Sequence, residues 1–133
     1  MSWRIPTMTE WADIWSGNAA ISSPSSAVAS IVANTWVWRD ATPTTNGNTT
    51  STAAGYEIRL DGVTTTLFLP AAGYRSYANG VLTYPGVHGN YWSSSAYGNN
   101  NFSNYLYFDN NTIVPPNFDR RTDGNSIRCI AEM

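Results

Sequence analysis

The first pattern of apolar positions lies near the N-terminus and predicts a short amphipathic helix. Trp11, Ile14 and Trp15 are spaced three residues and then one residue apart, which places them on one helical face. The preceding segment has capping-box spacing, with Thr7 as the N-cap and Glu10 at the third helical position. The three aromatic and aliphatic side chains are therefore expected to pack against the core.

A second helix is expected over residues 23–33, where Ser23 stands before Pro24 and an alanine-rich stretch follows. Beyond it, apolar residues alternate with polar ones, a period that is typical of strands. Asp61-Gly62 is the kind of dipeptide that joins two strands of a hairpin. Residues 40–54 are rich in Thr, Asn and Gly and predict a surface loop. Strands are expected at residues 36–38, 56–60, 63–69, 91–94, 105–108 and 126–130.

Two helices followed by a run of short strands favour the α+β class. The chain has 133 residues, which suits one hydrophobic core, and residues 1–133 are therefore interpreted as a single domain. We find no internal repeat and no composition change that would indicate a domain boundary.

The composition narrows the classes of function. Only 12% of the residues are charged, all seven basic residues are arginine, and the net charge is −2. Such a chain offers no basic face for phosphates, so nucleic acid and anionic membranes are not expected partners. No stretch approaches the roughly 20 apolar residues that a membrane-spanning helix needs. Aromatic residues reach 14%, and side chains of this kind are expected either to pack or to bind.

The residues that could support catalysis are few. Cys129 is the only cysteine, which rules out an intrachain disulfide, and we expect it to be a small core residue of the last strand. His88 is the only histidine and stands in a segment with turn composition. No nucleophile set, acid–base pair or metal cluster can be assembled, so we expect no enzyme activity, no cofactor and no metal.

Four segments, taken in order, resemble one family. Trp3-Arg4-Ile5-Pro6-Thr7, followed by Glu10-Trp11, resembles the opening of formylglycine-generating-enzyme-like and C-type-lectin-like domains. Leu67-Phe68-Leu69-Pro70-Ala71-Ala72-Gly73-Tyr74-Arg75 is similar to their central motif. Tyr91-Trp92-Ser93-Ser94-Ser95 and Gly124-Asn125-Ser126-Ile127-Arg128-Cys129 resemble two later strands. The order and the rough spacing match over nearly the whole chain.

The relatives that this resemblance implies are the "major paralogous" domains of gut bacteria and their phages. They include the variable proteins of diversity-generating retroelements, of which phage tropism determinants are an example. The resemblance implies a C-type-lectin-like fold, with two short helices packed on short antiparallel β-sheets and a ligand-binding face in the final third. It does not carry over the paired cysteines of formylglycine-generating enzymes, nor the proline tripeptides of calcium-dependent lectins.

The segment 90–125 is the predicted variable and ligand-binding region. It mixes Asn, which adapts its hydrogen bonds, with Tyr and Phe, which give contact area at low entropy cost. A retroelement that miscopies adenines would convert Asn codons, which begin with two adenines, into codons for Tyr, Asp, Ser, Phe and Gly. The predicted ligand-binding residues are Asn90, Tyr97, Asn99, Asn100, Asn101, Phe102, Asn104, Tyr105, Tyr107, Asp109, Asn110, Asn111, Asn117, Phe118, Asp119, Arg121, Asp123 and Asn125.

Alternation within this segment predicts which side chains face water. If Leu106 and Phe108 face the core, then Tyr105, Tyr107 and Asp109 point outward as candidates for contact with a ligand. A plainer interpretation stays open, because Asn-rich stretches also form ordinary turns between short strands.

Two functions from different classes fit these observations. The first is a receptor-recognition display protein, diversified by a retroelement, that binds a protein or glycan on another cell or particle. The second is an undiversified structural or adhesin module of a larger bacterial envelope protein. The opening Met1-Ser2-Trp3-Arg4 lacks the basic-then-apolar order of a signal peptide. Display on a virion or cell surface would then depend on a longer parent chain or on assembly into a particle.

Overall fold

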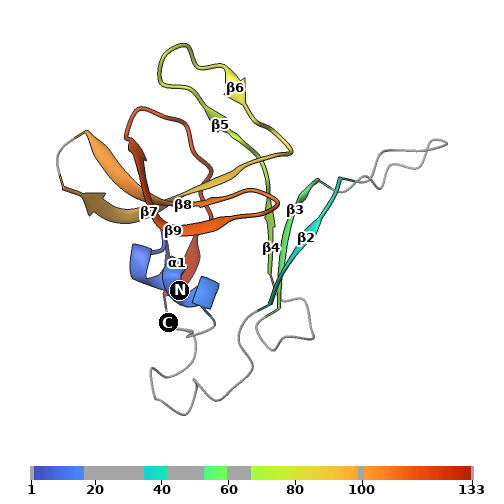
Figure 1. Ribbon diagram of the computed structural model, residues 1–133. Coiled ribbons are helices and arrows are strands. Elements are labelled where there is room, and N and C mark those ends of the chain that lie inside the picture. Colours follow the sequence, from blue (N-terminus) through green and yellow to red (C-terminus); the bar gives the residue numbers. More distant parts are fainter. Residues whose placement is uncertain (1, 17–34, 42–52, 60–66, 99–100, 133) are drawn as a thin grey trace.

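The computed structural model describes residues 2–16, 35–41, 53–59, 67–98 and 101–132 (Figure 1). Within these ranges the chain forms one helix and ten strands. The elements are β1 (Ser2–Arg4), α1 (Met8–Ser16), β2 (Thr35–Arg39), β3 (Gly55–Arg59), β4 (Leu67–Pro70), β5 (Tyr74–Arg75), β6 (Leu82–Thr83), β7 (Gly89–Tyr97), β8 (Phe102–Phe108), β9 (Ile113–Arg120) and β10 (Ile130–Glu132).

The strands form four small antiparallel sheets. Two of them have three strands, in the orders β2-β3-β4 and β7-β8-β9, and two are pairs, β1-β10 and β5-β6. The predicted hairpin is confirmed by the pairing of β3 with β4, in which Tyr56 lies opposite Leu69, while Asp61-Gly62 falls outside the described residues. Figure 1 shows α1 beneath the β7-β8-β9 sheet and the β5-β6 hairpin projecting on the opposite side.

The helix α1 begins as its capping box predicts. The Thr7 hydroxyl accepts a hydrogen bond from the Glu10 backbone N–H at 3.2 Å, and the Thr7 N–H donates to the Glu10 carboxylate at 3.3 Å. Arg4 donates to the same carboxylate at 2.7 Å. Of the predicted helical face, Trp11 is fully buried and Ile14 packs on the core, whereas Trp15 is exposed.

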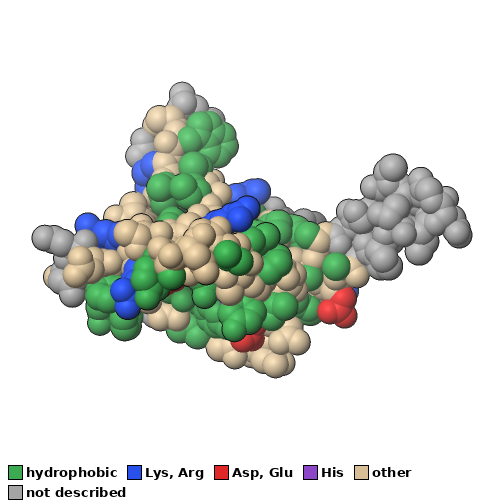
Figure 2. Space-filling view, turned by 90° about the horizontal axis from the view of Figure 1, so that it is seen from above, with side chains coloured by type: hydrophobic (Ala, Val, Ile, Leu, Met, Phe, Trp, Pro, Cys, Tyr) green, Lys and Arg blue, Asp and Glu red, His purple; other side chains and the backbone are tan. Residues whose placement is uncertain are grey.

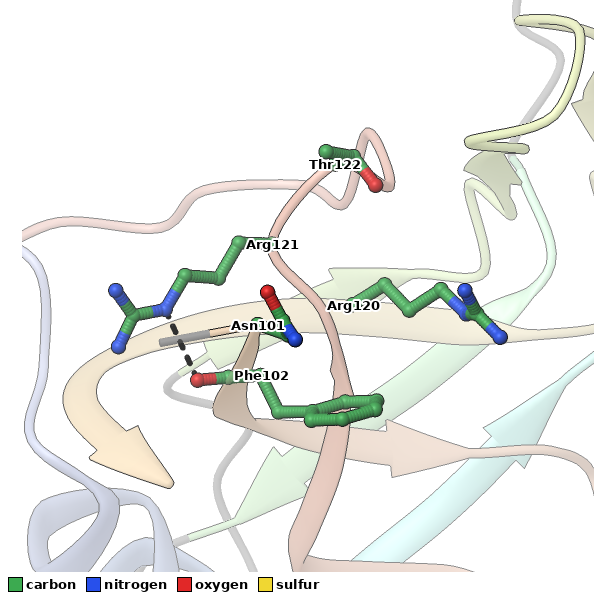
Figure 3. A pocket seen from close by; sticks show the side chains of 5 residues that line it. All are labelled: Asn101, Phe102, Arg120, Arg121 and Thr122. Carbon is green, nitrogen blue, oxygen red and sulfur yellow. Dashed lines mark hydrogen bonds between the residues drawn. The ribbon is translucent and has the colours of Figure 1, made fainter. Parts of the chain in front are cut away.

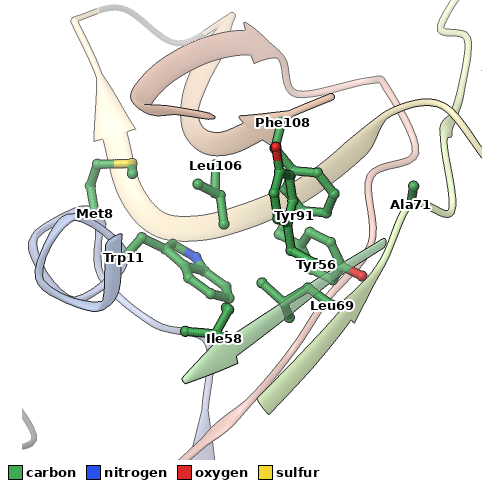
Figure 4. Close-up of a cluster of buried hydrophobic side chains, with 9 residues drawn as sticks. All are labelled: Met8, Trp11, Tyr56, Ile58, Leu69, Ala71, Tyr91, Leu106 and Phe108. Carbon is green, nitrogen blue, oxygen red and sulfur yellow. The ribbon is translucent and has the colours of Figure 1, made fainter. Parts of the chain in front are cut away.

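The hydrophobic core lies between α1 and the two three-stranded sheets. Trp11, Ile58, Leu69, Leu106 and Phe108 are each 1% exposed or less, and Figure 4 shows them converging from the helix and both sheets. Aromatic rings meet edge to face at the centre of this cluster, where the Tyr56 and Phe108 centroids are 5.2 Å apart. This core positions the β7-β8-β9 sheet relative to the rest of the fold.

A bulge in β7 attaches the helix to this sheet. The register between β7 and β8 shifts between Trp92 and Ala96. At this bulge, the Ser95 hydroxyl accepts a hydrogen bond from the Met8 N–H at 3.0 Å, and the Ser94 N–H donates to the Pro6 carbonyl at 2.8 Å. The serines of the Tyr-Trp-Ser-Ser-Ser segment therefore bind the backbone at the start of α1.

The expected α+β class, with two short helices packed on antiparallel sheets in a C-type-lectin-like arrangement, is wrong for the described residues. Strands dominate them and α1 is their only helix. The stretch expected to form a second helix, residues 23–33, lies outside the described residues. Strands form where the sequence alternates between apolar and polar residues, and several are longer than predicted. The described part of the chain is therefore mostly β, with several small sheets.

Two strand predictions also need correction. β9 was not predicted; it pairs with β8 at the sheet edge, with a register shift between Tyr105 and Tyr107. The last strand starts at Ile130 rather than at residue 126, and Cys129, expected in the core, is exposed.

Gly89 is the position where added volume is expected to be least tolerated. A Cβ built there would overlap the Phe108 ring at the centre of the core. We predict that Gly89→Ala lowers the free energy of unfolding by about 2 kcal/mol, because overpacking forces the ring or the backbone to move. Chemical denaturation measures the change. Ala96→Ser adds one atom at an exposed position of the same strand and should be nearly neutral, and an equally small effect at Gly89 would contradict this packing.

Candidate ligand-recognition surface

An aromatic cluster lies at the end of the β7-β8-β9 sheet. The rings of Tyr97 and Phe118 stack at 4.3 Å with an interplanar angle of 5°, and Phe102 contacts both edge to face. Tyr97 and Phe118 are nevertheless 40% and 47% exposed. Antiparallel pairing produces the cluster, because Phe102 lies opposite Tyr97 on one side and Arg120 on the other. All three aromatic residues were predicted from sequence as ligand-binding residues.

A pocket of about 340 Å³ adjoins this cluster. Figure 3 shows its lining residues, Asn101, Phe102, Arg120, Arg121 and Thr122. The Arg121 Nε–H donates to the Phe102 carbonyl at 3.0 Å, while the Arg120 and Arg121 side chains extend to opposite sides of the pocket. The pocket therefore combines an aromatic ring, an amide, a hydroxyl and two cations within the segment predicted to bind.

The β5-β6 hairpin extends this surface. The Arg120 guanidinium lies over the Tyr77 ring at 4.2 Å from its centroid, and the Arg75 and Gly124 backbones form two hydrogen bonds of 2.8 Å. Sequence reasoning missed the hairpin, whose exposed apolar residues are Tyr77, Val81, Leu82, Tyr84 and Val87. The available signal was the run of apolar residues at 81–87 among Gly, Pro and Asn.

Three predicted ligand-binding residues are buried instead. Asn90, Tyr105 and Asp123 are 3%, 7% and 7% exposed, so the expectation that Tyr105 points outward is wrong. Tyr105 does lie on the face opposite Leu106, but that face is covered as well. Its ring contacts Trp92 and Tyr107, and its hydroxyl accepts a hydrogen bond from the Asn117 amide at 3.4 Å. Burial raises the pKa of the Tyr105 hydroxyl, and the nearby Asp119 carboxyl adds to the shift.

Two carboxyl groups, Asp119 and Asp123, lie close together near Tyr105. We call the groups on this face of β8, which include Tyr105, Asp119 and Asp123, the covered layer. Burial raises the pKa of Asp119 to about 6, and a hydrogen bond with Asp123 contributes to the shift. Asp123 accepts a hydrogen bond from the Tyr77 N–H at 2.7 Å, and Asp119 accepts one from the Arg120 N–H at 2.8 Å. The pair therefore connects β9 and the loop after it to the hairpin, which is a structural role.

Tyr107 and Asp109 form a second group beside the hairpin. The Tyr107 hydroxyl donates to the Asp109 carboxylate at 2.9 Å, and His88 contacts the Tyr107 ring edge to face. Burial, this hydrogen bond and the charge of Asp109 raise the pKa of Tyr107 to about 12. Although burial opposes it, hydrogen bonds from the Asn111 and Thr112 N–H groups and from Tyr107 lower the pKa of Asp109. Asp109 therefore holds the β8-β9 turn.

The remaining predicted residues fall into several surroundings. Asn99 and Asn100 lie outside the described residues, and Asn110 and Asn111 are exposed in the β8-β9 turn. Asn104, Asn117 and Asn125 are half-buried, and Asn125 lies beside the Asp119 carboxyl. The structure thus brings together Tyr97, Asn101, Phe102, Phe118 and Arg121 on one surface and places other predicted residues beneath it or in turns.

Among the described residues, no three His, Cys, Asp or Glu side chains gather closely enough to hold a metal ion. The one helix of those residues falls short of the length and apolar character needed to cross a bilayer.

Comparison with known proteins gives one match. The family described as "Domain of unknown function (DUF8237)" matches residues 49–130, which is more than half of the chain. No curated protein and no solved structure matches it.

The burial of Tyr105 has a direct consequence for stability. We predict that Tyr105→Ala lowers the free energy of unfolding by about 3 kcal/mol, because removing a buried ring leaves a cavity. Tyr97→Ala removes the same atoms from an exposed position and should cost less than about 1 kcal/mol. Denaturation curves of both variants provide the comparison. Equal small losses would mean that Tyr105 is at the surface.

The Asp119–Asp123 pair predicts a pH dependence. The folded-state pKa of Asp119 is raised above the unfolded value, so its protonated form stabilises the fold at low pH and this contribution is lost as pH rises from about 4 to about 6. Asp119→Asn keeps an oxygen acceptor and removes the charge. We expect the variant to gain about 1–2 kcal/mol over the wild type between pH 4 and pH 7, after allowance for partial exposure. Urea denaturation across this range measures the gain, and a constant difference would contradict the pairing.

Proposed function

The chain belongs to the DUF8237 family of domains of unknown function, and we propose that it is a ligand-binding display domain diversified by a retroelement. Its target is a protein or glycan on another cell or particle. The observation that carries the proposal is the cluster of Tyr97, Phe102 and Phe118 beside a pocket, in which Tyr97 and Phe118 are exposed, within the Asn-rich and aromatic-rich C-terminal third.

Physical chemistry supports recognition at this cluster. Exposed apolar surface that gathers in one place is typical of interaction sites rather than of ordinary protein surface. Tyr and Arg are also the residues that most often dominate binding energy; two arginines line the pocket, and Tyr97 contacts the Phe102 ring that lines it. The motif resemblance to variable proteins of retroelements, with display on a virion or cell surface, belongs to the same proposal.

The burial of some predicted residues favours a second candidate function. Because Asn90, Tyr105 and Asp123 serve the fold, part of the Asn and Tyr content of the segment has a structural explanation. An undiversified structural or adhesin module of an envelope protein would carry the same buried layer. The two functions differ in whether exposed positions vary among close copies.

The coding DNA separates the two functions. We predict a near-identical repeat of the DNA for residues 90–125, close to a reverse transcriptase gene, that differs from it at adenines. Sibling sequences from the same locus should differ at exposed positions such as Tyr97, Asn101 and Phe118. They should keep Leu106 and Tyr105, because changes at buried positions cost several kcal/mol.

Sequencing the locus and its siblings measures both features. Absence of the repeat would contradict diversification. Substitutions spread equally over buried and exposed positions would separately contradict the assignment of the recognition surface.

A further inference from the structure

The arginines of the described residues fall into two groups. Arg4, Arg39 and Arg59 form salt bridges with Glu10 or Glu57. In contrast, Arg75, Arg120, Arg121 and Arg128 form no salt bridge with any described residue, although all four are exposed. We call Arg75, Arg120 and Arg121, together with Tyr77, the arginine face.

The carboxylates nearest to the arginine face are engaged elsewhere. Asp119 and Asp123 lie in the covered layer beneath it and interact with each other. Asp109 accepts hydrogen bonds from Tyr107 and from the backbone of the β8-β9 turn. None of these three carboxylates forms a salt bridge with the arginine face, in a chain whose net charge is −2. Figure 2 shows one side of the molecule, on which arginine side chains lie in several separate places and acidic ones only toward the lower and right-hand margins.

Each guanidinium of the arginine face is held in place by a neutral group. Arg75 donates to the Gly80 carbonyl at 3.2 Å, Arg120 stacks on Tyr77, and Arg121 donates to the Phe102 carbonyl at 3.0 Å. These contacts fix the side chains and leave several N–H donors of each unused. Because Arg120 and Arg121 diverge (Figure 3), they suit carboxylates spread over a surface rather than one small anion.

The surroundings of the arginine face indicate the chemical class of the partner. The hairpin that carries Arg75 and Tyr77 exposes the aliphatic side chains of Val81 and Leu82. Aliphatic side chains gain by contact with other apolar groups, which a polysaccharide or a phosphate backbone does not supply. Protein interfaces are enriched in Arg and aromatic residues, which matches this surface.

We propose that the arginine face, together with the exposed apolar side chains of the β5-β6 hairpin, docks a protein partner that presents acidic and apolar side chains. This inference rests on the proposed function and specifies its partner class. Electrostatic attraction orients the partner, and the apolar contacts on the hairpin and on the Tyr97–Phe118 stack hold it. Polysaccharide and nucleic acid are the alternatives that the experiment excludes.

The test measures binding of the purified chain to three immobilised polyanions. The probes are a random Glu–Tyr copolymer, polygalacturonate and double-stranded DNA, matched in charge and read by biolayer interferometry. We expect binding to the Glu–Tyr copolymer to be at least about tenfold tighter than to the other two, a difference of about 1.4 kcal/mol. Binding should weaken between about 50 mM and about 300 mM NaCl, as screening of exposed charges requires.

Variants assign this binding to the arginine face. The double variant Arg120→Gln/Arg121→Gln should weaken copolymer binding about tenfold or more. Arg39→Gln removes the same kind of charge from β2, where Arg39 pairs with Glu57, and should change binding less than about twofold. Thermal melts of all variants check that they remain folded.

The outcomes are distinguishable. No copolymer binding, tighter binding to polygalacturonate or DNA, or an equal loss in Arg39→Gln would overturn the acidic protein partner. None of these results depends on whether the coding-DNA repeat exists. The proposed function is therefore tested separately, by sequencing the locus. If the double variant does not fold, Arg75→Gln, whose guanidinium donates to the Gly80 carbonyl at the exposed hairpin tip, is measured in its place with the same expectation.

Discussion

The burial of β8 on both sides is the constraint on which the rest of the structure depends. Leu106 and Phe108 enter the apolar core, and Tyr105, on the other side, enters a layer of aromatic and polar groups. The buried half of β8 has no side left to present to a ligand. The exposed aromatic side chains Tyr97 and Phe118 lie instead toward the other end of the sheet, and further exposed apolar side chains lie on the adjoining hairpin.

The covered layer also fixes the position of the loop after β9 relative to the β5-β6 hairpin. Asp123 binds the Tyr77 backbone, and the bridge between Arg75 and Gly124 ties the loop after β9 to the hairpin. The pocket residues Arg120 and Arg121 are neighbours of these contacts in the chain. Buried carboxyl groups are costly unless they are hydrogen-bonded, so the layer specifies one position for the loop rather than adding much stability. The loop after β9 and the β5-β6 hairpin are therefore connected to each other by hydrogen bonds.

Sequence reasoning succeeded where the signal is local. The capping box at Thr7 and the alternation around Tyr56 depend on neighbours in the chain, and both elements form as predicted. Sequence reasoning failed where burial depends on a distant element. Alternation correctly places Tyr105 on the face opposite Leu106, but Tyr105 is buried because segments distant in the sequence cover that face. Tyr97, Phe102 and Phe118 were found from composition, yet their meeting depends on the register of three strands. The two-helix α+β class is wrong because strands dominate the described residues, among which α1 is the only helix.

The geometry of the aromatic cluster bears on how an exposed surface can bind tightly. Tyr97 and Phe118 stack on each other, and Phe102 contacts the edges of both, so the three rings are ordered before any ligand arrives. Ordering a side chain on binding costs about 0.5–1.5 kcal/mol, and a cluster that is already packed avoids much of that loss. The strands bring the three positions together through backbone pairing, whose hydrogen bonds are made by main-chain groups. Side chains at the strand ends can therefore change while the frame that positions them stays the same, which is the property that a diversified recognition surface requires.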